Sequence, residues 1–324
     1  MQSYEETKQR LAQISDLNIL EGALLSRYTR FGIGGPAGLL IETSNETSFI
    51  AALKAAREGG HNCAVIGDGT NLIVCDEGFP GIVLRFTAAS IRNTGTCIEV
   101  SAGAELQHLV DHAIDSGLKG IETMTGIPGT VGAAVYGNAG AYGHSIMERV
   151  NEVRFFDGDA IRVFSNSECE FAYRESVFKR HKDWIIFSTG LHMDRAPAEE
   201  LRRTADRILT IRNEKYPPTM KCAGSIFKNL ILAELAADLQ PRIPQRVIRE
   251  GKVPSAYFLE EVGAKGMKSG DIHVADYHAN LIYNAGAGNA RQLREVIGEL
   301  KTRVHERFGL LLEEEVQYVG FDGP

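Results

Sequence analysis

The stretch from residue 126 to residue 143 constrains this chain more than any other segment. Its eighteen positions hold six glycines, four alanines and one proline, with Thr130 and Asn138 among the remainder. A run with so little side-chain bulk is not expected to build a core. Glycine reaches positive φ and has no Cβ, so the backbone can approach a flat or anionic ligand closely, and successive amides can form an anion-binding concavity. A Gly/Ala-rich hairpin or helix crossing is the alternative, but the length of the run favours a ligand-binding loop.

Composition indicates an ordinary soluble protein. The 324 residues are 44% hydrophobic and 24% charged, with a net charge of −7, and a chain of this length forms about two or three compact units. Because both signs of charge are interspersed, nothing predicts a nucleic-acid partner. The five cysteines are scattered and show no CxxC spacing, so we expect neither disulfides nor a zinc site, and a reducing compartment.

The chain shows no targeting or metal-binding pattern. Residues 1–6 lack a basic region followed by an apolar run, and no segment approaches the ~20 apolar residues that span a bilayer. No group of His, Cys, Asp and Glu has metal-ligand spacing. We therefore expect a cytoplasmic protein without membrane insertion and without a bound metal.

Hydrophobic periodicity predicts helices and strands in mixed order. Helices are predicted at 5–17, 44–59 (with Ser44 as its cap), 105–116, 196–215 and 290–308. Strands are predicted at 37–42, 63–66, 72–74, 81–85, 98–102, 184–191, 271–275, 280–284 and after the last helix, with a hairpin of 146–156 and 160–164. This order is typical of an α+β or mixed α/β protein. A change in composition near residue 195 predicts a domain boundary just before the helix at 196.

A second glycine-rich loop, Gly67 to Asn71, follows the strand at 63–66. It matches neither the Rossmann glycine pattern nor the P-loop signature, and alone it would be interpreted as a hairpin turn. Together with the loop at 126–143, it indicates one half of a clamp around a dinucleotide, with backbone amides on the pyrophosphate.

Eight motifs in a fixed order identify a likeness to a known family. The chain resembles the UDP-N-acetylenolpyruvoylglucosamine reductases, also called UDP-N-acetylmuramate dehydrogenases, which are flavin enzymes of peptidoglycan precursor synthesis. The motifs run nearly end to end, at 28–37, 67–74, 126–143, 173–179, 223–229, 263–267, 278–280 and 312–316.

The resemblance implies an α+β fold, with a two-lobed FAD-binding domain of the vanillyl-alcohol-oxidase type and an α/β substrate-binding domain. The first lobe would comprise residues 1–88, with the C-terminal segment 310–324 returning to it. The second lobe would comprise 89–195 and the substrate-binding domain 196–309. Ser225 follows Arg174 by only 51 positions, so the chain is similar to the family type that lacks an extra tyrosine-bearing loop.

The resemblance also implies the reaction and its three catalytic residues. FAD reduced by NADPH would deliver a hydride from N5 to C3 of an enolpyruvyl ether, and protonation at C2 would complete the reduction. Arg174 would bind the substrate carboxylate as charge builds on it, and Ser225 would donate the proton. Glu315 would supply a proton, orient Arg174 or position a water, although Glu313 is an alternative in the Glu313–Glu315 run.

The same resemblance implies the binding residues. The cofactor-binding residues would be Arg30, Gly67, Gly69, Thr70, Asn71, Gly126, Ile127, Pro128, Gly129, Thr130, Gly132, Ala133, Asn138, Gly140 and Ala141. The substrate-binding residues would be Tyr173, Lys228 and Asn229, the last two at the diphosphate of the nucleotide sugar. Without the motifs, Ser225 would be interpreted as a turn residue, Arg174 as a surface partner of Glu175, and His278 as structural.

Several positions depart from the family pattern. Asp68 stands where the family commonly has glycine and Leu230 where it has proline, while 268–273 differ in sequence and 240–255 look like an insertion. Two other functions stay open: another FAD-dependent oxidoreductase on the same scaffold, because fold does not fix function, or a non-catalytic nucleotide-sugar-binding relative. The oligomeric state is also open, with a monomer among the options.

Overall fold

The computed structural model describes residues 4–321 and divides them into two compact units. Within that range, the first unit holds residues 4–23, 37–68 and 80–214, and the second unit holds 24–36, 69–79 and 215–321. Neither unit is one continuous stretch of chain. Residues 322–324 of the predicted C-terminal return lie outside the described residues, and the three-part division predicted from the sequence stays a prediction.

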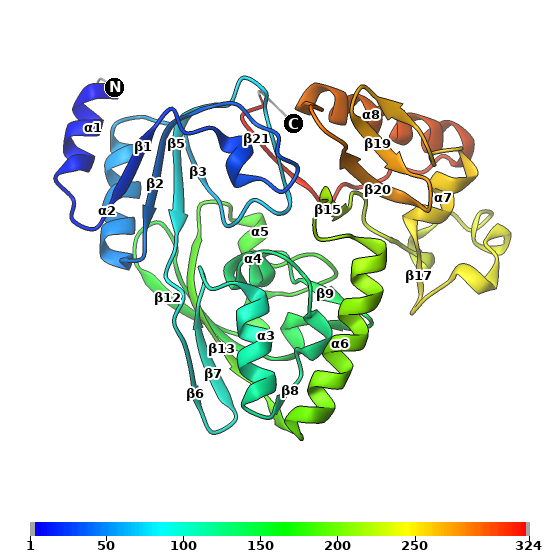
Figure 1. The fold of residues 1–324 in the computed structure, drawn as a ribbon, viewed down its shortest axis with the longest axis horizontal. Helices are drawn as coiled ribbons and strands as arrows, with labels where there is room; N and C mark the ends of the chain where they lie inside the picture. Colours follow the sequence, from blue (N-terminus) through cyan, green and yellow to red (C-terminus); the bar gives the residue numbers. More distant parts are fainter. Residues whose placement is uncertain (1–3, 322–324) are drawn as a thin grey trace. The chain divides into compact units, whose positions relative to one another are not determined.

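The first unit contains a four-stranded sheet near its N-terminus (Figure 1). The strand order is β1 (Asn18–Glu21), β2 (Ala37–Thr43), β5 (Phe79–Phe86) and β3 (Cys63–Val65). Two helices, α1 (Tyr4–Ala12) and α2 (Glu46–Glu58), lie beside it. The side chain of Asn45 accepts a hydrogen bond from the amide of Ser48 at 3.1 Å, so Asn45, not the predicted Ser44, caps α2.

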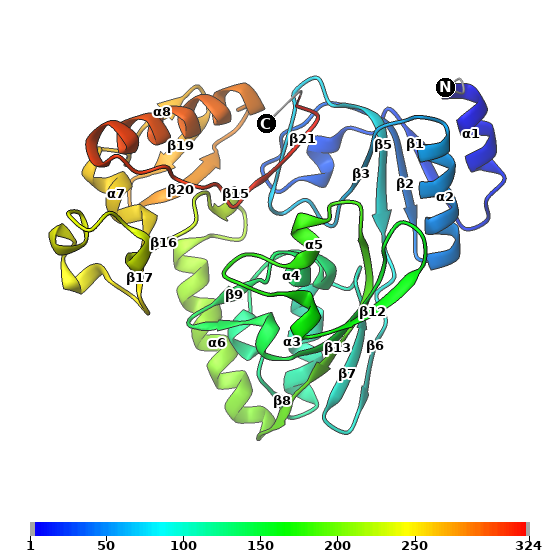
Figure 2. The ribbon, with the colours of Figure 1, turned by 180° about the vertical axis from the view of Figure 1, so that it is seen from behind.

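A five-stranded antiparallel sheet completes the first unit (Figure 2). Its order is β12 (Ile161–Ser165), β11 (Val150–Phe156), β13 (Ile185–His192), β7 (Cys97–Ser101) and β6 (Ile91–Thr94). The helices of this part are α3 (Leu106–Asp115), α4 (Val131–Tyr136), α5 (Val177–Arg180) and α6 (Ala198–Lys215). The same part of the chain contains two short antiparallel strand pairs. They are β8 (Leu118–Lys119) with β14 (Asp194–Arg195), and β9 (Gly140–Ala141) with β10 (His144–Ser145).

Aromatic packing fills the core of the five-stranded sheet. Phe155 is fully buried, and its ring contacts those of Phe164, Phe178 and Trp184 at centroid separations of 4.8, 5.1 and 4.9 Å. Aromatic pairs at these distances add to the stability that comes from burial. A neighbouring cluster contains Phe187 of β13 together with side chains of the four-stranded sheet and α2, so the two sheets of the first unit share a core.

The second unit is built on a four-stranded antiparallel sheet. Its order is β15 (Lys221–Ser225), β20 (His278–Asn284), β19 (Ile272–Ala275) and β18 (Lys268–Ser269), with helices α7 (Ser255–Glu261) and α8 (Ala290–Phe308). A pair of two-residue strands, β16 (Leu230–Ile231) and β17 (Lys252–Val253), encloses residues 232–251, which hold most of the predicted insertion at 240–255. The C-terminal β21 (Gln317–Val319) pairs in parallel with β4 (Leu72–Val74).

The last helix was predicted with its correct bounds, because its capping box and its C-terminal glycine are visible in the sequence. Asn289 and Gln292 exchange side-chain and main-chain hydrogen bonds at the start of α8, and Gly309 ends the helix at φ +69°, as left-handed C-caps require.

Further sequence predictions were wrong. The glycine-rich run is not loop throughout, because α4 forms in its middle and buries Val131, Ala134 and Val135 in the core. The first helix ends at Ala12 instead of residue 17, and the chain then turns through Asp16 at φ +60° into the unpredicted strand β1.

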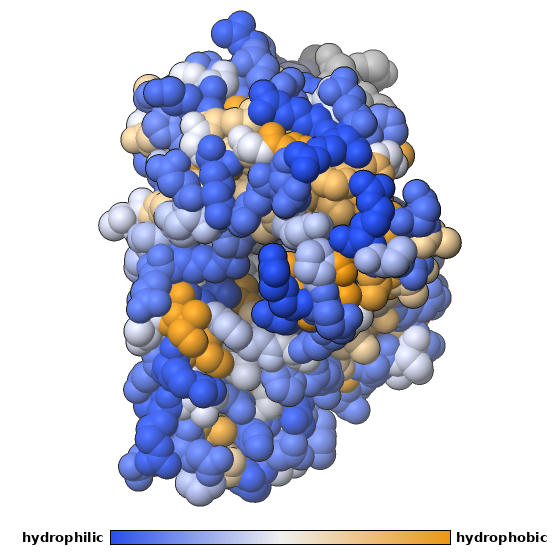
Figure 3. Space-filling view, turned by 90° about the vertical axis from the view of Figure 1, so that its right-hand side faces the viewer, coloured by the Kyte–Doolittle hydropathy of each residue, from blue (hydrophilic) through white to orange (hydrophobic). Residues whose placement is uncertain are grey.

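The face drawn in Figure 3 is largely hydrophilic, with hydrophobic side chains gathered in a few areas. Across residues 4–321, no helix is long and apolar enough to cross a membrane.

Gly69 occupies a position that excludes any side chain. Its φ is +61°, and an added Cβ would lie 1.8 Å from the carbonyl oxygen of Tyr28. A main-chain atom cannot move aside as a flexible side chain does, so the first loop depends on glycine here.

We expect Phe155→Ala to lower the free energy of unfolding by about 3–5 kcal/mol, because the change leaves a cavity beneath three aromatic rings. Urea denaturation followed by circular dichroism measures this. Val163→Thr serves as the control, because Val163 is 53% exposed, and a change there should stay within about 0.5 kcal/mol. Equal effects of the two substitutions would contradict the assignment of Phe155 to the core.

We expect Gly69→Ala to destabilise the protein more than Gly95→Ala does. Both glycines have positive φ, +61° and +64°, but an alanine Cβ at position 95 would meet no atom within 4 Å. The backbone conformation alone should cost about 1–2 kcal/mol at each site, and the clash with Tyr28 should add about 1–3 kcal/mol at position 69. Thermal melting of both variants tests this, and equal losses would show that the approach to Tyr28 does not matter.

Candidate active site

The first loop lies against the start of α4 in the first unit. A Cβ added to Gly67 would lie 2.8 Å from Oγ1 of Thr130, so two predicted cofactor-binding residues that are distant in sequence are neighbours. The carbonyl of Gly67 accepts a hydrogen bond from Nε of Arg85 at 3.1 Å. Thr130 in turn caps α4, because its Oγ1 accepts from the amide of Ala133 at 3.3 Å.

Main-chain hydrogen bonds hold the second loop tightly. The amide of Gly126 donates to Oε1 of Gln107 at 2.7 Å, and the carbonyl of Gly129 accepts from the amide of Leu106 at 2.9 Å. The amides of Ile127, Val131 and Gly132 also donate to protein carbonyls. These amides are therefore committed to the fold, and the nest of inward-pointing amides expected from the sequence does not form at those positions.

Asn138 fixes the far end of the second loop. It is 3% exposed and adopts φ +42°, a conformation that asparagine tolerates better than most residues. Its Nδ2 donates to the carbonyl of Ala172 at 2.7 Å, and its Oδ1 accepts from the amide of Met147 at 3.3 Å. This predicted cofactor-binding residue therefore also ties the loop to the segment that carries Tyr173 and Arg174.

Arg174 touches the second loop directly. Its Nη2 donates to the carbonyl of Gly140 at 2.9 Å, and its guanidinium lies 5.2 Å from the ring centroid of Tyr173. Its φ of +59° is unusual for a residue with a long side chain, and such conformations concentrate at functional sites. Glu175 forms an ion pair with Lys179 at 2.8 Å.

Ser225 lies at an irregularity of the second unit's sheet. The register of β15 against β20 shifts between Cys222 and Ser225, and Gly224 adopts φ +78°, as expected for a β-bulge that re-aims a side chain. The hydroxyl oxygens of Ser225 and Tyr216 are 3.3 Å apart. Tyr216 was not predicted as a site residue, because it stands before Pro217 and Pro218 at the end of a helix and its local sequence indicates only that end.

The C-terminal segment passes next to Ser225. The amide of Glu315 donates to the carbonyl of Ile226 at 2.7 Å, one residue after the serine. The carbonyl of Glu315 accepts from Nδ2 of Asn71 at 2.8 Å, and the amide of Arg30 donates to the carbonyl of Gly69 at 3.3 Å. The second unit thus joins predicted cofactor-binding residues of the first loop to a predicted catalytic residue near the other end of the chain.

The carboxylates of Glu313 and Glu314 pair with different lysines. Glu313 forms an ion pair with Lys228, whose side chain is only 9% exposed. Glu314 forms an ion pair with Lys301 at 2.7 Å and accepts from the hydroxyl of Tyr318.

The remaining predicted substrate residue and the His-Ala-Asn motif are structural neighbours. Oδ1 of Asn229 accepts from the amide of Ser255 at 3.4 Å. Asn280, which is 2% exposed, bonds both the amide and the carbonyl of Phe227 at 2.9 Å. Burial, together with the charge of Lys215, lowers the pKa of His278 to about 4, so this imidazole is neutral at physiological pH.

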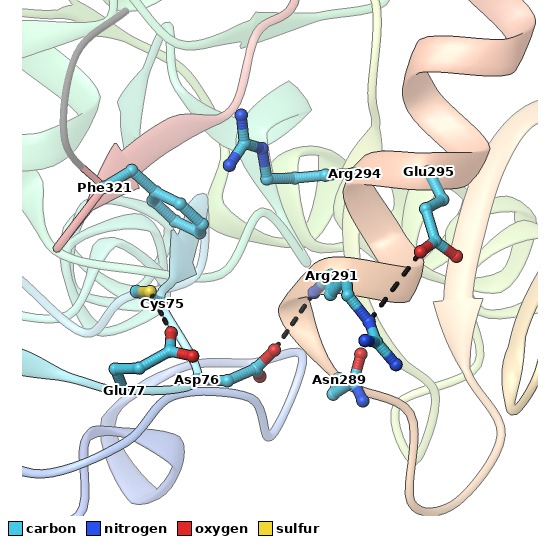
Figure 4. Close-up of a pocket in the computed structure, with 8 residues that line it drawn as sticks. All are labelled: Cys75, Asp76, Glu77, Asn289, Arg291, Arg294, Glu295 and Phe321. Atoms are coloured by element: carbon cyan, nitrogen blue, oxygen red, sulfur yellow. Dashed lines mark hydrogen bonds and ion pairs between the residues drawn. The ribbon is translucent and has the colours of Figure 1, made fainter.

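A separate cavity of about 690 Å³ opens at the start of α8 (Figure 4). Asp76 caps the N-terminus of α8, because its carboxylate accepts hydrogen bonds from the amides of Ala290 and Arg291 at 2.8 and 3.1 Å. The lining residues include none of the predicted site residues; they are Cys75, Asp76, Glu77, Asn289, Arg291, Arg294, Glu295 and Phe321. Within residues 4–321, no group of three His, Cys, Asp or Glu side chains is placed to hold a metal ion.

Comparison with known families divides the chain into two matched regions. Residues 37–163 match the FAD binding domain, and residues 216–319 match the C-terminal domain of UDP-N-acetylenolpyruvoylglucosamine reductase. These matches confirm the α+β fold class with a FAD-binding domain followed by a second domain, and they confirm FAD as the cofactor.

Similar proteins extend over nearly the whole chain. The UDP-N-acetylenolpyruvoylglucosamine reductase of Solibacter usitatus is 62% identical, covering 96% of this chain and all of that protein. The reductase of the same name from Rubrobacter xylanophilus is 34% identical over 91% of this chain and 93% of its own length. The crystal structure of the Thermus caldophilus reductase superposes with a TM-score of 0.72 at 29% identity, over 94% of this chain and 98% of that one. The chain therefore belongs to the UDP-N-acetylenolpyruvoylglucosamine reductase family.

Proposed function

We propose that this protein is an NADPH-dependent FAD enzyme that reduces UDP-N-acetylglucosamine enolpyruvate to UDP-N-acetylmuramate, in the cytoplasm, for peptidoglycan precursor synthesis. One observation carries the proposal: a chain with both domains of the reductase family also has an arginine, a serine and a glutamate at the three catalytic motif positions, Arg174, Ser225 and Glu315.

The two glycine-rich loops fit a flat, anionic cofactor. Gly67 lies against Thr130 with no room for a Cβ, so the loops meet without intervening side chains. The hydroxyl of Thr130, the exposed Asn71 and the main chain around Gly129 would hold FAD there. The proposed set also contains the other cofactor residues assigned by resemblance, from Arg30 to Ala141.

The reaction adds the elements of H₂ across a carbon–carbon double bond. FAD held by these loops and reduced by NADPH would supply the hydride that is added at C3 of the enolpyruvyl group. The electron pair of the double bond then moves to C2 and its carboxylate, and a proton added at C2 gives the lactyl ether. The protein must therefore stabilise negative charge on the carboxylate and provide one proton.

Arg174 is suited to the first of these tasks. Its planar guanidinium can pair with a carboxylate through two hydrogen bonds. The contact with the carbonyl of Gly140 and the stacking on Tyr173 hold it in place, which reduces the entropy lost when substrate binds. We assign Tyr173 to the substrate site because its ring supports the guanidinium of Arg174.

Ser225 is assigned as the proton donor. A hydroxyl is a weak acid, but a carbanion at C2 is a strong base, so the transfer is favourable once the hydride has added. The neighbouring hydroxyl of Tyr216, 3.3 Å from Oγ of Ser225, gives the serine a hydrogen-bonding partner that can orient it. The bulge at Gly224 leaves little bulk beside the donor.

The surroundings of the glutamate run favour Glu315 as the third catalytic residue. The amide of Glu315 is bonded to the carbonyl of Ile226, the residue after Ser225, while Glu313 and Glu314 form ion pairs with the lysines Lys228 and Lys301 of other segments; the assignment of Glu315 rests on its bond beside Ser225 and on the motif. We propose that Lys228 and Asn229 bind the diphosphate of the nucleotide sugar, with phosphate oxygens replacing Glu313 as the partner of Lys228.

We expect Ser225→Ala to separate the two half-reactions. NADPH should bleach the flavin absorbance of the variant at the wild-type rate, because the serine takes no part in that step. Reoxidation by UDP-N-acetylglucosamine enolpyruvate should slow by about 10²–10⁴-fold, the usual contribution of a positioned acid. Anaerobic stopped-flow spectroscopy measures both steps.

The wild-type protein provides the control. Flavin that bleaches with NADPH and stays bleached after substrate addition would favour a different FAD-dependent oxidoreductase. Flavin that NADPH does not bleach would favour a non-catalytic nucleotide-sugar-binding protein. A protein that cannot bind FAD at all would refute the proposed function.

We expect Glu315→Gln to lower kcat by about 10²–10⁴-fold, because the amide cannot exchange a proton. Glu313→Gln, two residues away, should leave kcat within a few-fold of the wild type and act on KM through Lys228. Steady-state kinetics of the two variants decides between the residues. The reverse result, a large loss of kcat in Glu313→Gln alone, would move the catalytic assignment to Glu313.

A further inference from the structure

The guanidinium of Arg85 makes three contacts beneath the first loop. Nε donates to the carbonyl of Gly67 at 3.1 Å, and Nη2 pairs with Oδ1 of Asp68 at 3.0 Å. Nη1 pairs with Glu42 of β2. Arg85 and Glu42 side chains are each 19% exposed and that of Asp68 is 33% exposed, so the cluster is largely shielded from water and its interactions are stronger than at an open surface.

The ion pair of Arg85 with Asp68 matters because Asp68 is a carboxylate in a proposed cofactor loop. A carboxylate within a loop that receives a diphosphate repels that ligand, and the repulsion grows as water is excluded. The ion pair with Arg85 binds the carboxylate on the β5 side of the loop and opposes its charge. Without the arginine, the carboxylates of Asp68 and Glu42 would lose the positive charge that they share.

The contact with Gly67 gives Arg85 a second effect on the same loop. The carbonyl of Gly67 is fixed by Nε, and the Cα of Gly67 faces Oγ1 of Thr130 so closely that no Cβ fits between them. The guanidinium of Arg85 therefore acts on the first loop in two ways. It opposes the charge of Asp68, and it fixes the carbonyl of Gly67, the residue that lies against Thr130 of the second loop.

We propose that Arg85 is a positioning residue of the FAD site: it offsets part of the charge of Asp68 and holds the carbonyl of Gly67, so that the first loop accepts an anionic cofactor. The inference rests on the proposed assignment of FAD to the two glycine-rich loops. Arg85 lies at the end of β5 and acts through Gly67 and Asp68.

The test is FAD binding to apoprotein, followed by quenching of flavin fluorescence. Arg85→Gln should raise the Kd for FAD at least tenfold, equivalent to about 1.4 kcal/mol. Asp68→Asn alone should leave the Kd within threefold of wild type, because an amide oxygen still accepts from Arg85. The double variant Arg85→Gln/Asp68→Asn should recover at least a third of the loss on a logarithmic scale, because the repelling charge is gone.

Arg154→Gln is the matched control. Arg154 also makes a partly buried pair with a glutamate of the first unit, Glu46, but it contacts neither loop residue. This variant should melt earlier than wild type yet bind FAD with unchanged affinity. If Arg85→Gln loses its cooperative thermal transition, Arg85→Lys with and without Asp68→Asn replaces it, because lysine keeps the charge but cannot reach all three acceptors.

Two results would overturn the inference: an Arg85 variant that binds FAD within threefold of wild type, or a double variant that recovers nothing. Failure of the underlying site assignment is distinguishable. Thr130→Val and Gly67→Val should both weaken FAD binding if the loops hold the cofactor. If they do not, while wild-type protein binds FAD, the loop assignment fails independently of Arg85.

Discussion

Main-chain hydrogen bonding along residues 313–319 is the constraint on which the second unit depends. Within seven residues, this segment bonds to Lys228 and Ile226 on one side and to Asn71 on the other, and it then pairs with β4 as β21. Three stretches of chain that are far apart in sequence are thereby held in one register. A shift of a single residue in a strand would turn each side chain to the opposite face, so the register also decides which glutamate is bonded through its main chain to Ile226, the residue after Ser225.

In the first unit, the two glycine-rich loops are held by close backbone contacts and hydrogen bonds instead of by strand register. The first loop meets the start of α4 at Gly67 and Thr130, while hydrogen bonds from the second loop to α3 and to the segment after β7 keep α4 in place. Arg174 and Asn138 connect the same loop to the segment at 172–174. Rigid loops of this kind are pre-organised for a ligand, so little conformational entropy is lost on binding.

The sequence indicated two glycine-rich loops but not their internal structure. The glycine content of residues 126–143 indicated close backbone approach, whereas the short helix α4 was missed because Val131, Ala134 and Val135 are too few to give a helical period. Strand β1 was missed because it has only four residues, of which only Ile19 is partly shielded from solvent, so it gives no alternating pattern. Helix α8, in contrast, has a capping box, a clear apolar face and a terminal glycine, all of which are local.

The sequence by itself determined the family, the cofactor class and the identity of candidate residues, because each motif and each helix cap consists of residues that lie close together in the sequence. Tertiary structure alone decided how those residues are supported. The ion pair of Glu313 with Lys228, the hydroxyl contact of Tyr216 with Ser225 and the three contacts of Arg85 each join segments that are not neighbours along the chain. Such contacts leave no local pattern, since their partners lie on different elements, from 9 to 85 positions apart, and only the folded backbone brings them within hydrogen-bonding distance.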